Sequence, residues 1–163
     1  MSLHVPVGAL PVGTLDTLPP LEAAAVRGLR LWFSGQEAQA AVWNVFARTF
    51  GARQGRASLR AFESFVDTLL EASPRPLMRH GLACRCLGAD EHAFAALLSA
   101  AARGEREEAI LLALAFVPAH HALPLVAAAE AAGPILARVA DPLAALIPPA
   151  RPAPASAAFP TLH

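Results

Sequence analysis

Apolar residues recur every three to four positions through most of this chain, and glycine or proline interrupts the pattern at short intervals. This spacing places apolar side chains on one face of a helix, so it predicts a series of amphipathic helices. We expect them at residues 21–33, 36–50, 55–72, 90–103, 105–117, 123–132 and 135–139. The sequence therefore predicts an all-α fold, a compact orthogonal bundle of about six or seven helices.

Strands are less well supported, because tyrosine is absent and β-branched residues are few. The stretch Ala109–Val117 is apolar on every side, so we expect it at the centre of the core. We expect His120 and His121 in or beside the connection that follows it, and a chain break at Gly133–Pro134. Residues 75–88 show no clear period and indicate a short helix or a turn.

The two ends of the chain differ from its middle in composition. Residues 1–20 contain four prolines and two glycines, so we expect an extended or disordered arm. Residues 148–163 are rich in proline and alanine, which predicts a flexible, disordered tail. Between them, residues 21–147 have the size of a single helical domain.

Charge and hydropathy argue against two classes of function. The formal net charge is zero, whereas nucleic-acid binding draws on long-range attraction by basic residues. The helix expected at 105–117 also begins with acidic residues, which do not suit a DNA groove. The apolar segment 109–126 is interrupted by prolines and histidines and is too short for a membrane span. We therefore expect neither a nucleic-acid partner nor an integral membrane protein.

Other features bear on origin, compartment and activity. All thirteen basic residues are arginine and alanine is abundant, a composition typical of a GC-rich bacterial genome. The two cysteines are one residue apart, which does not suit a secreted disulfide framework, and no signal peptide is visible, so we expect a cytoplasmic protein. No phosphate-binding glycine loop, nucleophile elbow or His-Glu-x-x-His motif occurs, so nothing positively indicates an enzyme.

Side chains capable of thiol or metal chemistry gather just before the helix expected at 90–103. Thiolates and imidazoles are zinc ligands, and four of them complete a tetrahedral site. The candidate ligands are His80, Cys84, Cys86 and His92. Cys86 also precedes a helix start and follows Arg85, two features that favour a reactive thiolate. Cysteines buried as small apolar residues, with surface histidines, are the third interpretation.

Arginines gather on one side of the helix expected at 55–72 and just before it. Arg53, Arg56 and Arg60 come first, and Glu63, Asp67 and Glu71 follow toward its end. This order opposes the helix dipole, which favours acids first and bases last. The compensating charge comes from the acidic half of the same chain, residues 86–141, where seven acids outnumber three arginines, from an acidic partner or from a bound anion.

These features support two hypotheses about function. The first is a small bacterial helical protein that acts by binding, as an adaptor or regulator of a protein partner, through Arg53, Arg56 and Arg60. Homodimerisation anchored by Trp32 or Trp43 is a variant of it, although both tryptophans also suit the core. The second is a thiol-redox or zinc-binding protein centred on the Cys-x-Cys pair.

Overall fold

The computed structural model describes residues 6–148, and helices dominate them. In chain order the elements are the 3₁₀ helix η1 (Val7–Ala9), strand β1 (Pro11–Thr14), the 3₁₀ helix η2 (Leu15–Thr17), helices α1 (Pro20–Trp32), α2 (Gln36–Phe50) and α3 (Ala52–Ala72), strand β2 (Cys86–Gly88), and helices α4 (Ala89–Ala102), α5 (Arg106–Ala113), α6 (Ala119–Arg138) and α7 (Ala140–Ala145). The all-α bundle expected from the sequence is confirmed, with seven α-helices in this part of the chain. The expected tail from residue 149 onward lies outside the described residues.

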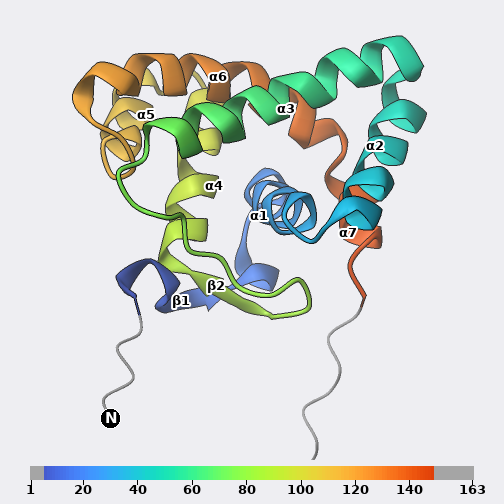
Figure 1. The fold of residues 1–163 in the computed structure, drawn as a ribbon, viewed down its shortest axis with the longest axis horizontal. Coiled ribbons are helices and arrows are strands. Elements are labelled where there is room, and N and C mark those ends of the chain that lie inside the picture. The colour runs from blue at the N-terminus through green and yellow to red at the C-terminus, as the bar shows by residue number, and fades with distance from the viewer. Residues whose placement is uncertain (1–5, 149–163) are drawn as a thin grey trace, which may run out of the picture.

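Helix α1 lies at the centre of the bundle. Figure 1 shows it almost end-on, with the other helices around it, and it packs against α2, α4, α6 and α7. Its alanines and Gly28 are small enough for neighbours to approach on several sides, and a Cβ on Gly28 would already touch the ring of Phe62 at 3.4 Å. At the end of α1, Trp32 meets the same phenylalanine edge-on, with ring centroids 6.2 Å apart.

Helix α5 does not occupy the central position expected for Ala109–Val117. Of the residues in α5, only Ala109 and Ala113 are buried, and Leu111 is 70% exposed. The helix packs on α4 and α6, where Ile110 and Leu112 are only partly buried against the core and Leu111 faces outward. The expectation is wrong because an uninterrupted apolar sequence does not identify which of its sides other helices cover.

Helix α6 runs unbroken from Ala119 to Arg138, so the predicted break at Gly133–Pro134 is wrong. Both histidines expected in or beside a connection lie in its first turn. An interior proline costs a helix about 3 kcal/mol. Burial along α6 offsets that cost, since Leu136 is fully buried and Gly133 packs so closely on α4 that an added Cβ would lie 2.6 Å from Cβ of Ala102.

The described part of the N-terminal arm is packed against the bundle. Strand β1 pairs with β2 in an antiparallel register that matches Thr14 with Cys86 and Pro11 with Gly88. Gly8 is buried against Asp90 at the start of α4, where a Cβ would overlap the carboxylate. The sequence predicted neither strand, and their pairing joins the arm to the segment that carries the cysteines.

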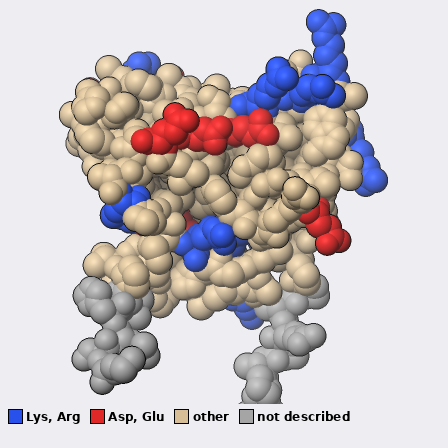
Figure 2. Space-filling view, in the orientation of Figure 1, with Lys and Arg blue, Asp and Glu red and all other residues tan. Residues whose placement is uncertain are grey.

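The outer face of α3 carries charge in a regular order. Figure 2 shows acidic side chains in a row over α3 and basic side chains where the helix begins. Elsewhere on this face, basic and acidic side chains occur in separate patches. No helix within residues 6–148 has both the length and the apolar character that a membrane span requires.

Candidate metal centre

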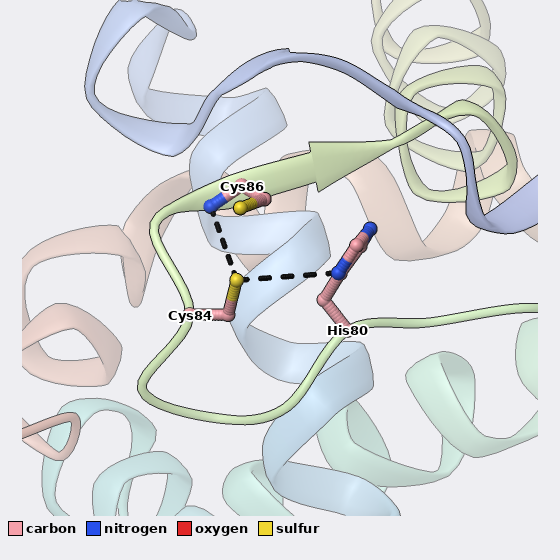
Figure 3. Close-up of side chains that lie close together, drawn as sticks. All are labelled: His80, Cys84 and Cys86. Atoms are coloured by element: carbon pink, nitrogen blue, oxygen red, sulfur yellow. Dashed lines mark hydrogen bonds between the residues drawn. The ribbon is translucent and has the colours of Figure 1, made fainter.

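The segment between α3 and α4 brings three of the expected ligands together. Its chain turns back at Leu82 and Ala83, where the N–H of Cys84 donates to the carbonyl of Gly81 at 3.0 Å. Two cysteines one residue apart need a tight loop if both sulfur atoms are to face the same point. This turn supplies that loop. Figure 3 shows Sγ of Cys84 between the backbone nitrogen of Cys86 and the ring of His80.

The spacing of the donor atoms is close to that of a metal site. One ligand atom from each of His80, Cys84 and Cys86 lies within 4.8 Å of the other two. Nδ1 of His80 is 4.0 Å from Sγ of Cys84. Tetrahedral zinc with ordinary bond lengths separates two sulfurs by roughly 3.8 Å and a sulfur from a nitrogen by roughly 3.5 Å. Small side-chain rotations therefore bring the three atoms to bonding positions.

The histidine ring is held in the orientation that a ligand needs. Nε2 of His80 lies 3.1 Å from the carbonyl oxygen of Ala9, which has only lone pairs to offer, so Nε2 carries the proton and donates it. Nδ1 then keeps its lone pair, and that atom faces the thiol of Cys84. Metal-binding histidines commonly donate their second ring N–H to a carbonyl in this way. The arm thus selects the tautomer that can bind a metal.

A buried arginine anchors the backbone of the loop. Arg30 of α1 is 0% exposed, and its five N–H groups all find acceptors. Two of them donate to the carboxylate of Glu91 at 2.7 and 2.8 Å. The other three donate to the carbonyls of Gly81, Cys84 and Cys86, at 3.2, 2.6 and 2.6 Å. Both cysteines are therefore attached to the central helix through their own backbones.

Glu91 completes the anchor from α4. Its carboxylate also accepts the backbone N–H of His80 at 3.0 Å and that of Gly88 at 2.9 Å. Burial alone would raise the pKa of Glu91, but the hydrogen bond from Arg30, the backbone donors and the charge of Arg30 outweigh it and lower the pKa. The carboxylate is thus ionised near neutral pH, and the buried pair holds a backbone atom of each of the three ligand residues.

A second carboxylate, one residue before Glu91 on α4, also binds this segment. Asp90 accepts two hydrogen bonds from Arg75, at 2.7 and 2.8 Å, and the N–H of Met78 at 2.9 Å. Burial would raise the pKa of Asp90, yet the hydrogen bonds from Arg75 and Met78 and the charge of Arg75 outweigh it and lower the pKa. The loop is therefore attached to α4 on both sides of the ligand group.

Neither Arg30 nor Glu91 was predicted from the sequence. The only hint of Arg30 is an arginine between two leucines in an apolar helix, and no local pattern sets Glu91 apart from other acids near a helix start. The two residues lie 61 positions apart, so no local spacing connects them. A charged residue on an otherwise apolar helix face is the one signal that points to a buried partner.

The structure also changes the expected chemistry of Cys86. Its pKa is raised, first by the hydrogen bond with Cys84 and then by the negative charge of the Cys84 thiolate, while Arg30 lowers it to a smaller extent. Arg85 does not act on it as expected, because its guanidinium pairs with Asp16 instead, at 2.5 Å. The N–H of Cys86 donates to Sγ of Cys84 at 3.3 Å. The geometry therefore does not support a reactive thiolate at Cys86 alone.

The fourth expected ligand, His92, is not part of this group. It lies on the exposed side of α4, whereas the three grouped side chains are partly buried. A pocket of about 320 Å³ adjoins the group, and its lining includes Cys84 together with Asp16, Arg27 and Arg85. A small ligand in this pocket would lie beside Cys84.

The three arginines predicted to bind a partner lie far along the chain from this group, on α3. All are exposed, and the guanidinium of Arg56 lies 5.7 Å from the centre of the Trp43 ring. None of the three forms an ion pair with any residue in 6–148. The pairing with the acidic half of the chain that was one interpretation of their charge is therefore absent from this range.

Comparison with known proteins supplies no relative for this chain. No protein-family model matches it, and neither does any curated protein or solved structure.

Proposed function

We propose that the protein binds one Zn²⁺ ion through Nδ1 of His80 and the Sγ atoms of Cys84 and Cys86. The observation that carries the proposal is the convergence of these three donors within 4.8 Å. Thiolate and imidazole ligands suit zinc, which takes four ligands in a tetrahedron. Three protein ligands leave one position for water or an external ligand, an arrangement typical of reactive or exchangeable zinc rather than of closed structural sites.

The surroundings of the group support the proposal. The hydrogen bond from His80 to the carbonyl of Ala9 is the outer-shell contact that zinc-binding histidines commonly make. The backbone bonds to Arg30 and Glu91 hold the ligands in place before any ion arrives, which lowers the cost of ordering them on binding. The proposal takes the cytoplasm as the compartment, because thiols stay reduced there.

A thiol-redox role would use the same two sulfurs. The position of His80 favours the metal, since a disulfide between Cys84 and Cys86 has no need of an imidazole lone pair directed at the sulfur. The adaptor or regulator role is independent of this site. It stays a prediction, and it concerns the arginines of α3.

Cobalt titration of the reduced, full-length protein under anaerobic conditions tests the proposal. We expect one Co²⁺ per chain, with the charge-transfer and ligand-field bands of tetrahedral thiolate coordination, and displacement of the cobalt by zinc. Cys84→Ser, Cys86→Ser and His80→Ala should each weaken binding more than about 100-fold, since loss of an outer-shell partner alone costs about 10- to 100-fold. His92→Ala is the matched control and should bind like the parent.

The outcomes separate the alternatives. Equal cobalt binding by the parent and the two serine variants would disprove the site. If His92→Ala lost cobalt binding, His92 would be a fourth ligand, as the sequence predicted. A parent that shows no cobalt bands but whose thiols react rapidly with an alkylating agent would replace the metal proposal with the thiol-redox one.

A further inference from the structure

Six charged residues form a single stripe along α3, here called the α3 stripe. They are Arg53, Arg56, Arg60, Glu63, Asp67 and Glu71. At 100° per residue, they fall within about 80° of the helix circumference. Five of them are exposed and Glu63 is partly exposed. Figure 2 shows the acidic part as a row on the open face of the molecule, with basic side chains beyond it.

The stripe has no partner within the described chain. None of its members forms an ion pair with a residue in 6–148. The pKa of Glu63 is raised by burial and by the charge of Asp67, and Arg60 on the same helix only partly opposes this. Arg53 also stands in the first turn of α3, at the positive end of the helix dipole. Neither half of the stripe is therefore paired with a charged residue of another element in residues 6–148.

The charges of the stripe are complementary to the same charges in reverse order. Three basic residues occupy the first half of the stripe and three acidic residues the second, at nearly mirrored intervals. An antiparallel copy of the same helix sets base against acid along the whole length. An acidic protein would meet Glu63, Asp67 and Glu71 as like charges, and a basic protein would meet the arginines. A second copy of this chain is the partner that satisfies both halves.

We propose that the protein forms a twofold-symmetric dimer in which α3 packs antiparallel against α3 of a second copy. The axis crosses the stripe midway between Arg60 and Glu63, which places Arg60 of one copy opposite Glu63 of the other. The same register sets Arg56 opposite Asp67. Each pair occurs twice because the interface is isologous.

Other features of α3 fit this arrangement. Arg53 lies opposite Leu70 and one position from Glu71 in the same register, and Leu70 is among the exposed large apolar residues. Ala57 and Ser64 lie beside the stripe and are exposed, so two helices can approach each other closely there. Antiparallel alignment also opposes the two helix dipoles, so each basic end lies near a negative helix terminus.

Sedimentation velocity of the full-length protein, from micromolar to high micromolar concentration, tests the dimer. We expect a reversible dimer whose dissociation constant rises with added sodium chloride, because the contact is made by exposed charges. Arg56→Glu and Asp67→Arg should each weaken it about tenfold, since each change places two like-charged pairs in the interface. Both changes in one chain should restore the dimer, because the swapped charges face each other again.

A mixing experiment makes the test specific. One variant carries Arg53→Glu, Arg56→Glu and Arg60→Glu, and a second carries Glu63→Arg, Asp67→Arg and Glu71→Arg. Each should be a monomer with an unchanged helical circular dichroism spectrum, and an equimolar mixture should form the heterodimer. Reversal of Glu107 and Glu108, exposed on α5 and outside the stripe, should leave the dimer unaffected.

Three results would overturn the proposal. They are a parent that stays monomeric throughout the range, a dimer that is insensitive to the single reversals, and a double charge swap that fails to restore association. The single and double swaps keep the test decisive even if a triple variant does not fold. A monomeric parent would return the arginines to the hypothesis of a different, acidic partner.

Discussion

Replacing Glu91 with glutamine tests the anchor beneath the metal-binding loop. The carboxylate accepts four hydrogen bonds, two from Arg30 and one each from the backbone of His80 and Gly88. Glutamine has the same shape but only one acceptor oxygen, and its NH₂ group would face donors. Removing one partner of a buried ion pair typically costs about 3–5 kcal/mol. We expect a loss of about that size, a large part of the roughly 5–15 kcal/mol that stabilises a domain.

Urea unfolding followed by circular dichroism measures this loss. The matched control is Glu105→Gln, which removes the charge of an exposed pair with Arg103 and should leave the free energy of unfolding close to that of the parent. A Glu91→Gln variant as stable as this control would refute the argument. We also expect the folded Glu91→Gln protein to bind cobalt more weakly, because the amide of His80 loses its acceptor.

A double variant distinguishes the contribution of the Arg30–Glu91 ion pair from that of the hydrogen bonds between Arg30 and the loop. Many buried ion pairs are replaced by apolar residues at little cost. Arg30→Met with Glu91→Leu should remain destabilised by about 3 kcal/mol or more, because three loop carbonyls lose a donor at about 1 kcal/mol each. Parent-like stability of this double variant would show that the loop does not depend on Arg30.

Two further predictions concern pH and core position. Because the pKa of Asp90 is lowered in the folded protein, its stabilising effect is full above the ordinary value of about 3.9 and is lost as the pH falls through the lower folded-state value. Asp90→Asn should therefore flatten the loss of stability as the pH falls below about 4 in urea unfolding, and equal slopes would contradict this. Leu111→Gln on α5 should change stability by no more than about 0.5 kcal/mol, whereas Leu98→Ala in α4 should cost about 2–5 kcal/mol. The reverse ranking in the same assay would show that α5 is the central helix after all.

Local patterns were sufficient for α1, α2 and α4, whereas the short helix expected at 135–139 is part of α6 and α7 was not predicted. Helix α2 matches its predicted range, and α1 and α4 match theirs within one residue at each end, because period and glycine or proline boundaries are properties of neighbouring residues. The failures at α5 and α6 have a different origin. Whether Leu111 is exposed, and whether α6 continues through Pro134, depends on which elements pack beside these helices. The spacing of residues within one helix does not indicate its neighbours.

The candidate metal centre was partly visible in the same way. The clustering of His80, Cys84 and Cys86 along the chain indicated a zinc or thiol site, and the structure brings these three together. His92 is equally close in sequence, but the helix it belongs to carries it to the exposed side. The contact between His80 and Ala9 joins residues 71 positions apart, so the tautomer was not predictable from spacing.

The sequence by itself determined that this chain is helical, where α1, α2 and α4 begin and end, and which short segment holds the chemically reactive side chains. These properties follow from interactions among residues a few positions apart. Only the tertiary structure decided that α1 is the central helix, that Arg30 and Glu91 hold the loop, and that the α3 stripe has no partner within the described chain. Burial and charge pairing depend on which distant segments meet, and that is settled only when the whole chain packs.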